Sequence, residues 1–186
     1  MMGSKSILPQ GYTALEYIEN TDQAMFTIPV FPPFSVEIDF APNLNFSFQY
    51  SVAFGINASF QAGFKSNGVA YIGNKGSTTV FFRDGVKSKI TATVTLSATT
   101  TSYYVDGVNT GLSRSSSNIS DWCLFAATPA PAYPARGKMY SFRLWKDGEL
   151  IFDLKPCINP SGVYGMYDII NNVFSGSITS TPFTGQ

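Results

Sequence analysis

Short segments in which apolar and polar residues alternate, separated by turn residues, dominate this sequence. In residues 34–40 (FSVEIDF) the apolar side chains occupy every second position. A period of two is typical of a strand that buries one face. Further strands are predicted at 46–56, 69–72, 78–83, 89–96, 102–105, 108–112, 122–127, 138–145 and 149–154, and two more within 161–174. Together these are about twelve strands, and this number with no strong helical period predicts an all-β protein of two packed antiparallel sheets.

Turn residues support this strand assignment. Asp106-Gly107 and Asp147-Gly148 each separate two β-prone segments. Both central positions of a tight hairpin turn must tolerate positive φ, which favours Asp-Gly. Asn171-Asn172 is expected to join the last two strands at an edge of the sandwich. Residues 129–134 contain three prolines, which predicts a loop, because proline cannot donate to a strand ladder.

The alternation also predicts which side chains form the core. Residues that share the buried register of their strands are expected to face the space between the sheets. These are Val36, Ile38, Phe48, Val94, Val105, Phe125, Phe142 and Leu144.

Chain length and composition fit one domain with a short extension. The 186 residues are 44% hydrophobic, enough for a core that needs no covalent cross-link. Residues 1–10 contain Ile7, Leu8 and Pro9 but no periodic pattern. We therefore predict an extended N-terminal arm over 1–10, ordered by lying in a partner's groove, and a single sandwich domain over 11–186.

Charge argues against several classes of partner. Twelve basic residues balance twelve acidic ones, and no run of five basic residues occurs, so nucleic-acid binding is not expected. No stretch approaches the ~20 apolar residues of a membrane span, and the N-terminus does not resemble a secretory signal. Only 13% of residues are charged, about half the usual share. Such a surface suits a protein docked in an assembly.

Cys123 and Cys157 are the two cysteines, and the chain contains no histidine. A metal site built from histidine and cysteine is therefore excluded. Two alternatives remain for the cysteines. The favoured one is that both are small, separately buried core residues, and the other is that they form one disulfide.

Several segments together resemble concanavalin A-like (laminin G-like) domains of bacteriophage structural proteins and bacterial surface proteins. The resemblance covers nearly the whole chain, from Leu8 to Phe183. It implies a jelly-roll sandwich, a fold used for glycan binding, adhesion and virion decoration. The segments are 8–19 (LPQGYTALEYIE), 103–108 (YYVDGV), 137–145 (GKMYSFRLW), 153–156 (DLKP), 162–168 (GVYGMYD) and Phe174.

The resemblance sets the functional expectation. We expect a non-enzymatic structural or binding protein of a bacteriophage virion, such as a capsid or fibre decoration. Its partners would be other virion proteins and surface glycans, and it would be present in many copies. It would be made in the host cytoplasm without a signal peptide and would act on the virion. The alternative is a carbohydrate-binding module of a bacterial surface system.

Glu37-Ile38-Asp39 is the best candidate for catalysis, because it resembles the first part of a glucanase motif found on this fold. Retaining glycoside hydrolysis needs two carboxyl groups ~5 Å apart, one of them a proton donor. Alternate residues of a strand share a face, so Glu37 and Asp39 point the same way. The proton donor would follow, but 41–43 is Ala-Pro-Asn, and none of these residues can donate a proton. We therefore predict no enzymatic activity.

Glycan binding would require an aromatic platform and planar polar groups. Tyr133 and Arg136 lie in or next to the proline-rich loop, and Trp145 lies in the opposite register to its apolar neighbours. These three residues are the candidate ligand-binding residues. For Trp145, and for Trp122, packing between the sheets is the favoured alternative.

Calcium is the one cofactor that the resemblance implies. Asp84, Asp106, Asp121 and Asp147 lie at predicted strand ends. A calcium site needs several oxygens that converge on one point. Because Asp106 and Asp147 each precede glycine, turn formation explains them first.

Overall fold

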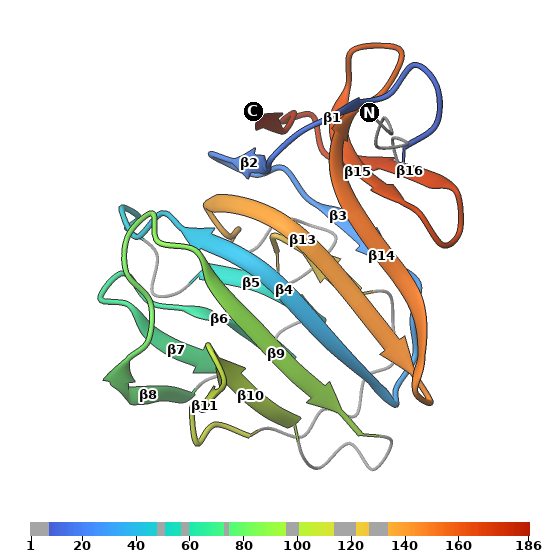
Figure 1. Ribbon diagram of the computed structural model, residues 1–186. Coiled ribbons are helices and arrows are strands. Elements are labelled where there is room, and N and C mark those ends of the chain that lie inside the picture. Colours follow the sequence, from blue (N-terminus) through green and yellow to red (C-terminus); the bar gives the residue numbers. More distant parts are fainter. Residues whose placement is uncertain are drawn as a thin grey trace, which may run out of the picture.

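The computed structural model describes residues 8–47, 51–56, 60–72, 75–95, 101–113, 122–126 and 134–186. These residues form strands, turns and loops. Two antiparallel sheets pack face to face as a sandwich, which confirms the predicted fold class (Figure 1). Within these ranges no helix has the length and apolar character to span a bilayer.

The larger sheet has eleven strands. Its main path runs in the order β11-β10-β9-β4-β13-β14-β15-β16; β1 pairs with β14, β2 with β13, and β17 with β2. The strands are β1 (Thr13–Ala14), β2 (Ile18–Asn20), β4 (Phe34–Pro42), β9 (Ser88–Val94), β10 (Thr101–Val105), β11 (Val108–Asn109), β13 (Gly137–Lys146), β14 (Glu149–Ile158), β15 (Tyr164–Asp168), β16 (Val173–Gly176) and β17 (Thr184–Gly185).

The smaller sheet has six strands in the order β3-β12-β5-β6-β7-β8. Its first and last members, β3 and β8, are therefore edge strands. The strands are β3 (Phe26–Ile28), β5 (Ser51–Ile56), β6 (Phe60–Phe64), β7 (Val69–Ile72), β8 (Lys75–Val80) and β12 (Trp122–Leu124).

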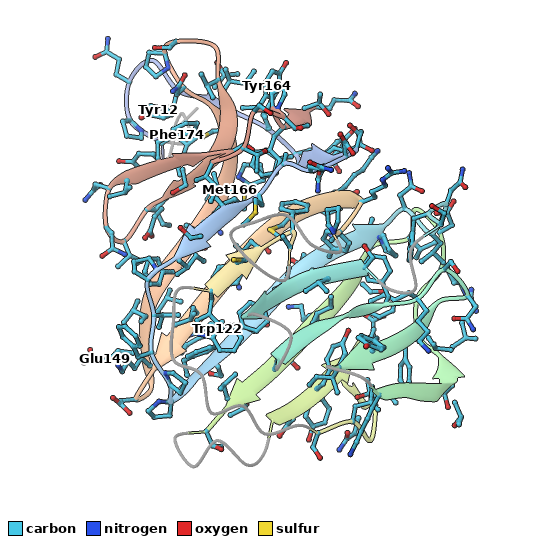
Figure 2. The ribbon with its side chains drawn as sticks, turned by 180° about the vertical axis from the view of Figure 1, so that it is seen from behind. Tyr12, Trp122, Glu149, Tyr164, Met166 and Phe174 are labelled. Atoms are coloured by element: carbon cyan, nitrogen blue, oxygen red, sulfur yellow. The ribbon has the colours of Figure 1, made fainter. Side chains whose placement is uncertain are left out.

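The core lies between the sheets and follows the predicted register. Along β4 every second residue from Phe34 is buried, while Ser35, Glu37 and Asp39 are partly exposed. Trp122 stacks on Phe54, with ring centroids 4.6 Å apart, and Figure 2 shows it between the sheets. Of the predicted core residues, Phe48 lies outside the described residues. The others are buried: Val36, Ile38, Val94, Val105, Phe125, Phe142 and Leu144.

Some strand boundaries differ from the predictions for local reasons. Phe46 was expected in a strand, but its N–H donates to the carbonyl of Leu44, which turns the chain there. The strand predicted over 78–83 begins earlier, at Lys75, and ends at Val80. It ends there because the N–H groups of Phe81 and Phe82 both donate to the Gly68 carbonyl. Such contacts depend on neighbours that a periodicity argument does not include.

Three predicted turns are confirmed by the backbone. Asp106 and Asp147 have φ angles of 50° and 51°, and a glycine with positive φ follows each. They join β10 to β11 and β13 to β14. Asn172, with φ of 59°, lies in the turn between β15 and β16. The Asp-Gly and Asn-Asn pairs thus occupy conformations that few other residue types adopt at low cost.

The cysteines are separate buried residues, so the favoured interpretation is confirmed and the disulfide alternative is wrong. Cys123 lies in β12 of the smaller sheet, and Cys157 lies in β14 of the larger one; the two are not joined by a disulfide. Burial raises the pKa of the Cys157 thiol to about 11. A thiol whose pKa is raised in this way is a weak nucleophile near neutral pH, because the thiolate is the reactive form.

The first described residue, Leu8, packs on its own domain. It is buried in a cluster with Cys157 and Tyr167, which Tyr12 and Phe174 extend. The ring centroids of Tyr12 and Phe174 are 5.9 Å apart. Figure 2 shows the two residues at the same end of the molecule. The packed part of the chain thus includes Leu8, and residues 1–7 of the predicted arm lie outside the described residues.

Candidate functional site

The predicted ligand-binding residues do not form one site. Trp145 lies near the end of β13, and Arg136 immediately precedes the start of that strand. Nine residues of extended chain separate them by roughly 30 Å, too far for one monosaccharide to contact both. Tyr133 lies outside the described residues.

Arg136 has a role in packing. Its guanidinium lies 3.9 Å from the carboxylate of Asp22, and its backbone carbonyl accepts the N–H of Asn43. Both contacts connect Arg136 to segments that flank other strands. This arrangement ties the start of β13 to two neighbouring loops.

Trp145 lies on the outer face of the larger sheet, which corrects the favoured expectation that it packs between the sheets. It pairs with Ser35 of β4, and Ser35 in turn pairs with Thr93 of β9. Because Phe34 and Val36 point inward, Ser35 and its partners in this row point outward. The indole is half-buried. Three strands thus place an aromatic ring and two hydroxyl groups in one row.

A shallow groove with a volume of about 270 Å³ follows this row. Asp147, in the β13–β14 turn, adds an exposed carboxylate at one side of the groove. The described lining contains no lysine or arginine. The complete described lining is Pro33, Phe34, Ser35, Thr93, Val94, Thr95, Trp145, Asp147 and Gly148.

The chemistry of this groove suits a neutral, hydroxyl-rich ligand. An indole offers a flat apolar face with a polar N–H at its edge. Hydroxyl groups both donate and accept hydrogen bonds, and an ionised carboxylate accepts several. A ligand with one apolar face and a rim of hydroxyl groups would match both kinds of group at once.

The former catalytic candidate, Glu37, belongs to a row of alternating charges on the same outer face. Its Oε1 lies 3.0 Å from Lys89 Nζ and 3.2 Å from Arg143 Nη1. Arg143 Nε lies 3.6 Å from Asp153 Oδ1, which lies 2.8 Å from Lys155 Nζ. We call these five residues the charge ladder; it crosses β9, β4, β13 and β14. Each carboxylate contacts two cations within the protein.

Asp39 shares the outer face with Glu37, as the strand period predicts, and accepts a hydrogen bond from Ser141 Oγ at 3.0 Å. The next residue in that register, Ala41, is buried and has no proton to donate. Both carboxylates therefore have structural partners.

The aspartates considered for calcium act locally. Asp84 Oδ1 accepts the N–H of Leu44, and Asp106 Oδ1 accepts the N–H of Lys89. In the part of the chain that the structure describes, no three His, Cys, Asp or Glu residues converge as a metal site would require. Asp121 lies outside those residues. The described aspartates thus do not fit a calcium site.

Comparisons with known proteins match the fold. No family model matches the chain, and no curated protein matches it. Among solved structures, a "putative carbohydrate binding protein" from Bacteroides ovatus superimposes with a TM-score of 0.53 at 12% identity. The match covers 91% of this chain and 62% of that one, so this chain spans less than two thirds of its length.

Two further solved structures superimpose less closely. Domain 4 of an extracellular GH43 arabinanase from Geobacillus stearothermophilus, in complex with arabinotriose, gives a TM-score of 0.47 at 12% identity, covering 86% of this chain and 85% of that one. The extracellular region of zebrafish Gpr126/Adgrg6 gives 0.42 at 15% identity, covering 95% and 26%. Similarity at this level of identity is similarity of fold, and the phage-associated family remains a resemblance.

Trp145 was a candidate from the sequence, but the residues around it were not predicted as part of a site. Ser35 and Thr93 are ordinary outward positions of their strands, and Asp147 was explained by its turn. Only the strand order β13-β4-β9 puts Ser35 and Thr93 beside the indole, whereas Asp147 is near it in sequence. The sequence does show that Ser35 and Thr93 occupy outward positions of their strands, but many other residues do so as well.

Proposed function

We propose that this protein binds a neutral glycan in the Trp145 groove. The observation that carries the proposal is the row of Trp145, Ser35 and Thr93 on the outer face, with Asp147 beside it. A pyranose ring would stack on the indole through its C–H face, and its hydroxyl groups would bond to the polar residues. The similarity in fold to a putative carbohydrate binding protein supports this proposal.

A neutral ligand is proposed because of the charges that line the groove. The groove has one carboxylate and, among its described lining residues, no cation to pair with a uronate or a sulfate. An acidic sugar would place like charges near Asp147, which is unfavourable. The groove therefore favours neutral sugars over acidic ones.

The test is a glycan array with the purified full chain, followed by calorimetry with the best neutral oligosaccharide. Trp145→Ala should weaken binding about tenfold or more, because it removes the stacking surface. Arg136→Ala, immediately before the start of the same strand and roughly 30 Å from Trp145, is the control and should leave affinity within about twofold. Unchanged affinity in Trp145→Ala, or binding restricted to acidic glycans, would contradict the proposal.

We further propose that binding occurs without hydrolysis. Glu37 is held by Lys89 and Arg143, Asp39 is held by Ser141, and Ala41 follows in their register. The pair therefore has no proton donor at the third position. Incubation with β-glucans and other polysaccharides should release no reducing sugar, and turnover that Glu37→Gln abolishes would contradict this proposal.

For the biological setting we propose the surface of a bacteriophage virion. The support is the sequence resemblance over 8–183 together with the low content of charged residues. Mass spectrometry of purified particles should find the chain in many copies per particle. Its absence from particles, with recovery at a bacterial surface, would favour the alternative, a carbohydrate-binding module.

A further inference from the structure

The β8 strand is an edge strand, and among its N–H groups that of Thr79 already donates to Ser77 Oγ. It is the last strand of the smaller sheet and pairs with β7 on one side (Figure 1). No described strand lies on its other side, and its residues are exposed except Ser77, which is partly exposed. Unpaired N–H and C=O groups along an exposed edge are a template for pairing with another extended chain.

The surroundings of this edge are basic. From residue 40 to residue 83 the sequence contains no Asp or Glu, but it contains Lys65, Lys75 and Arg83. Lys65 Nζ lies 5.6 Å from the ring centroid of Tyr71 and beside Gly76 of β8. The ion pairs found among the described residues involve other side chains. The charges of Lys65 and Lys75 thus have no carboxylate in their own segment, whereas Arg83 is followed directly by Asp84.

A hollow of about 400 Å³ lies beside the C-terminal end of β8. Val80 and Val86 line it and are 60% and 50% exposed, which is high for valine. Arg83 and Asp106 also line it, and one oxygen of Asp106 accepts the N–H of Lys89. The hollow therefore offers apolar walls with one guanidinium and one carboxylate nearby.

We propose that the β8 edge binds an extended, acidic segment of a partner protein as an added strand. Backbone hydrogen bonds to β8 would supply affinity, as in other strand-addition complexes. Carboxylates of the segment would pair with Lys65, Lys75 and Arg83, and one apolar side chain would enter the hollow. Lysines on an exposed edge oppose pairing with neutral or basic strands, so the same charges make the edge selective for acidic segments.

The experiment begins with a random peptide library displayed on phage and selected on the folded full chain. The selected peptides should be acidic, free of proline, and rich in β-branched residues. A synthetic, labelled version of the most enriched peptide is then titrated by fluorescence anisotropy. Lys75→Glu and Arg83→Glu should each weaken binding about tenfold or more. Lys146→Glu, an equal change of charge on β13, is the matched control and should stay within about twofold.

Hydrogen exchange separates strand addition from diffuse charge attraction. The peptide should slow exchange of backbone amides within Lys75–Val80 by about tenfold or more, because the added strand excludes water from that edge. Folding of each variant is checked by its melting temperature. Selection of neutral or basic peptides, failure to enrich any peptide, or binding without protection of these amides would overturn the proposal. Tighter binding of an acidic oligosaccharide at the same residues, or dimerisation of the chain through β8, would also overturn it.

Discussion

The two tryptophans lie in contrasting surroundings, one between the sheets and one on the outer face of the larger sheet. Trp122 lies between the sheets, stacked on Phe54 and in edge contact with Phe34. Trp145 lies on the outer face of the larger sheet, half-buried among hydroxyl groups. A buried indole stabilises the fold through its packing, whereas a half-buried one leaves surface for a ligand.

The largest effect is expected when the interior tryptophan is removed. Trp122→Ala would leave a cavity beneath Phe34 and Phe54, and should destabilise the protein by about 3–5 kcal/mol. Urea denaturation followed by circular dichroism measures this change. A loss below about 1 kcal/mol would show that the two indoles are energetically alike and would break the comparison.

A smaller effect is expected for the hydrogen bond that joins the two sheets. Tyr103 in β10 donates its hydroxyl to the Gly63 carbonyl in β6 at 2.9 Å, and burial raises the pKa of this phenol. Tyr103→Phe would leave that carbonyl buried without its partner, at a cost of about 1–2 kcal/mol. Tyr104→Phe, on the outward position of the same strand, is the control and should cost less than about 0.5 kcal/mol.

A pH-dependent effect is expected at Cys157. Its pKa is raised from 9.0 to about 11 because burial disfavours the thiolate. Between pH 9 and pH 11 the folded state therefore retains a proton that the unfolded state loses. The contribution of the Cys157 thiol to the free energy of unfolding is complete below pH 9 and is lost as the pH rises toward 11. Wild-type stability should fall more steeply over this range than that of Cys157→Ala. An equal dependence of stability on pH in the two proteins would contradict the raised pKa of Cys157.

A slight effect on stability is expected for the outer tryptophan. Trp145→Ala should change the free energy of unfolding by less than about 1 kcal/mol, since the groove is already open to solvent. Measuring Trp145→Ala and Trp122→Ala in the same urea series compares the contributions of the two indoles to stability directly. A loss above about 2 kcal/mol would identify Trp145 as a packing residue.

The smallest effect is expected in the charge ladder. Glu37→Gln removes the carboxylate between Lys89 and Arg143, at a cost of about 0.5 kcal/mol. This cost should shrink in 1 M salt, because the side chains of both cations are partly exposed. A loss that is independent of salt would show that the ladder contributes through packing.

The sequence predicted a large part of the fold and a small part of the candidate site. Alternation located β4, β9 and β13, and the Asp-Gly pairs located two hairpins, because these signals depend on local period and local φ. Two-residue strands such as β1 and β17 escaped prediction, since they exist only through their pairing with β14 and β2. For the groove, Trp145 could be named as a candidate from the sequence, but its neighbours could not.

By itself the sequence determined which face of each main strand is buried. That property follows from side-chain direction along one strand, which a few consecutive residues define. The register of β4 therefore already separated Val36 and Ile38 from Glu37 and Asp39.

Only the tertiary structure decided which strands are neighbours. β4 pairs with β13, about one hundred residues further along the chain, and with β9 on its other side. Many strand orders would bury the same apolar faces, so burial alone does not determine the order. The native order must also satisfy the backbone hydrogen bonds and allow the two sheets to pack closely. That choice brings Ser35 and Thr93 beside Trp145, and it leaves β8 as an edge strand.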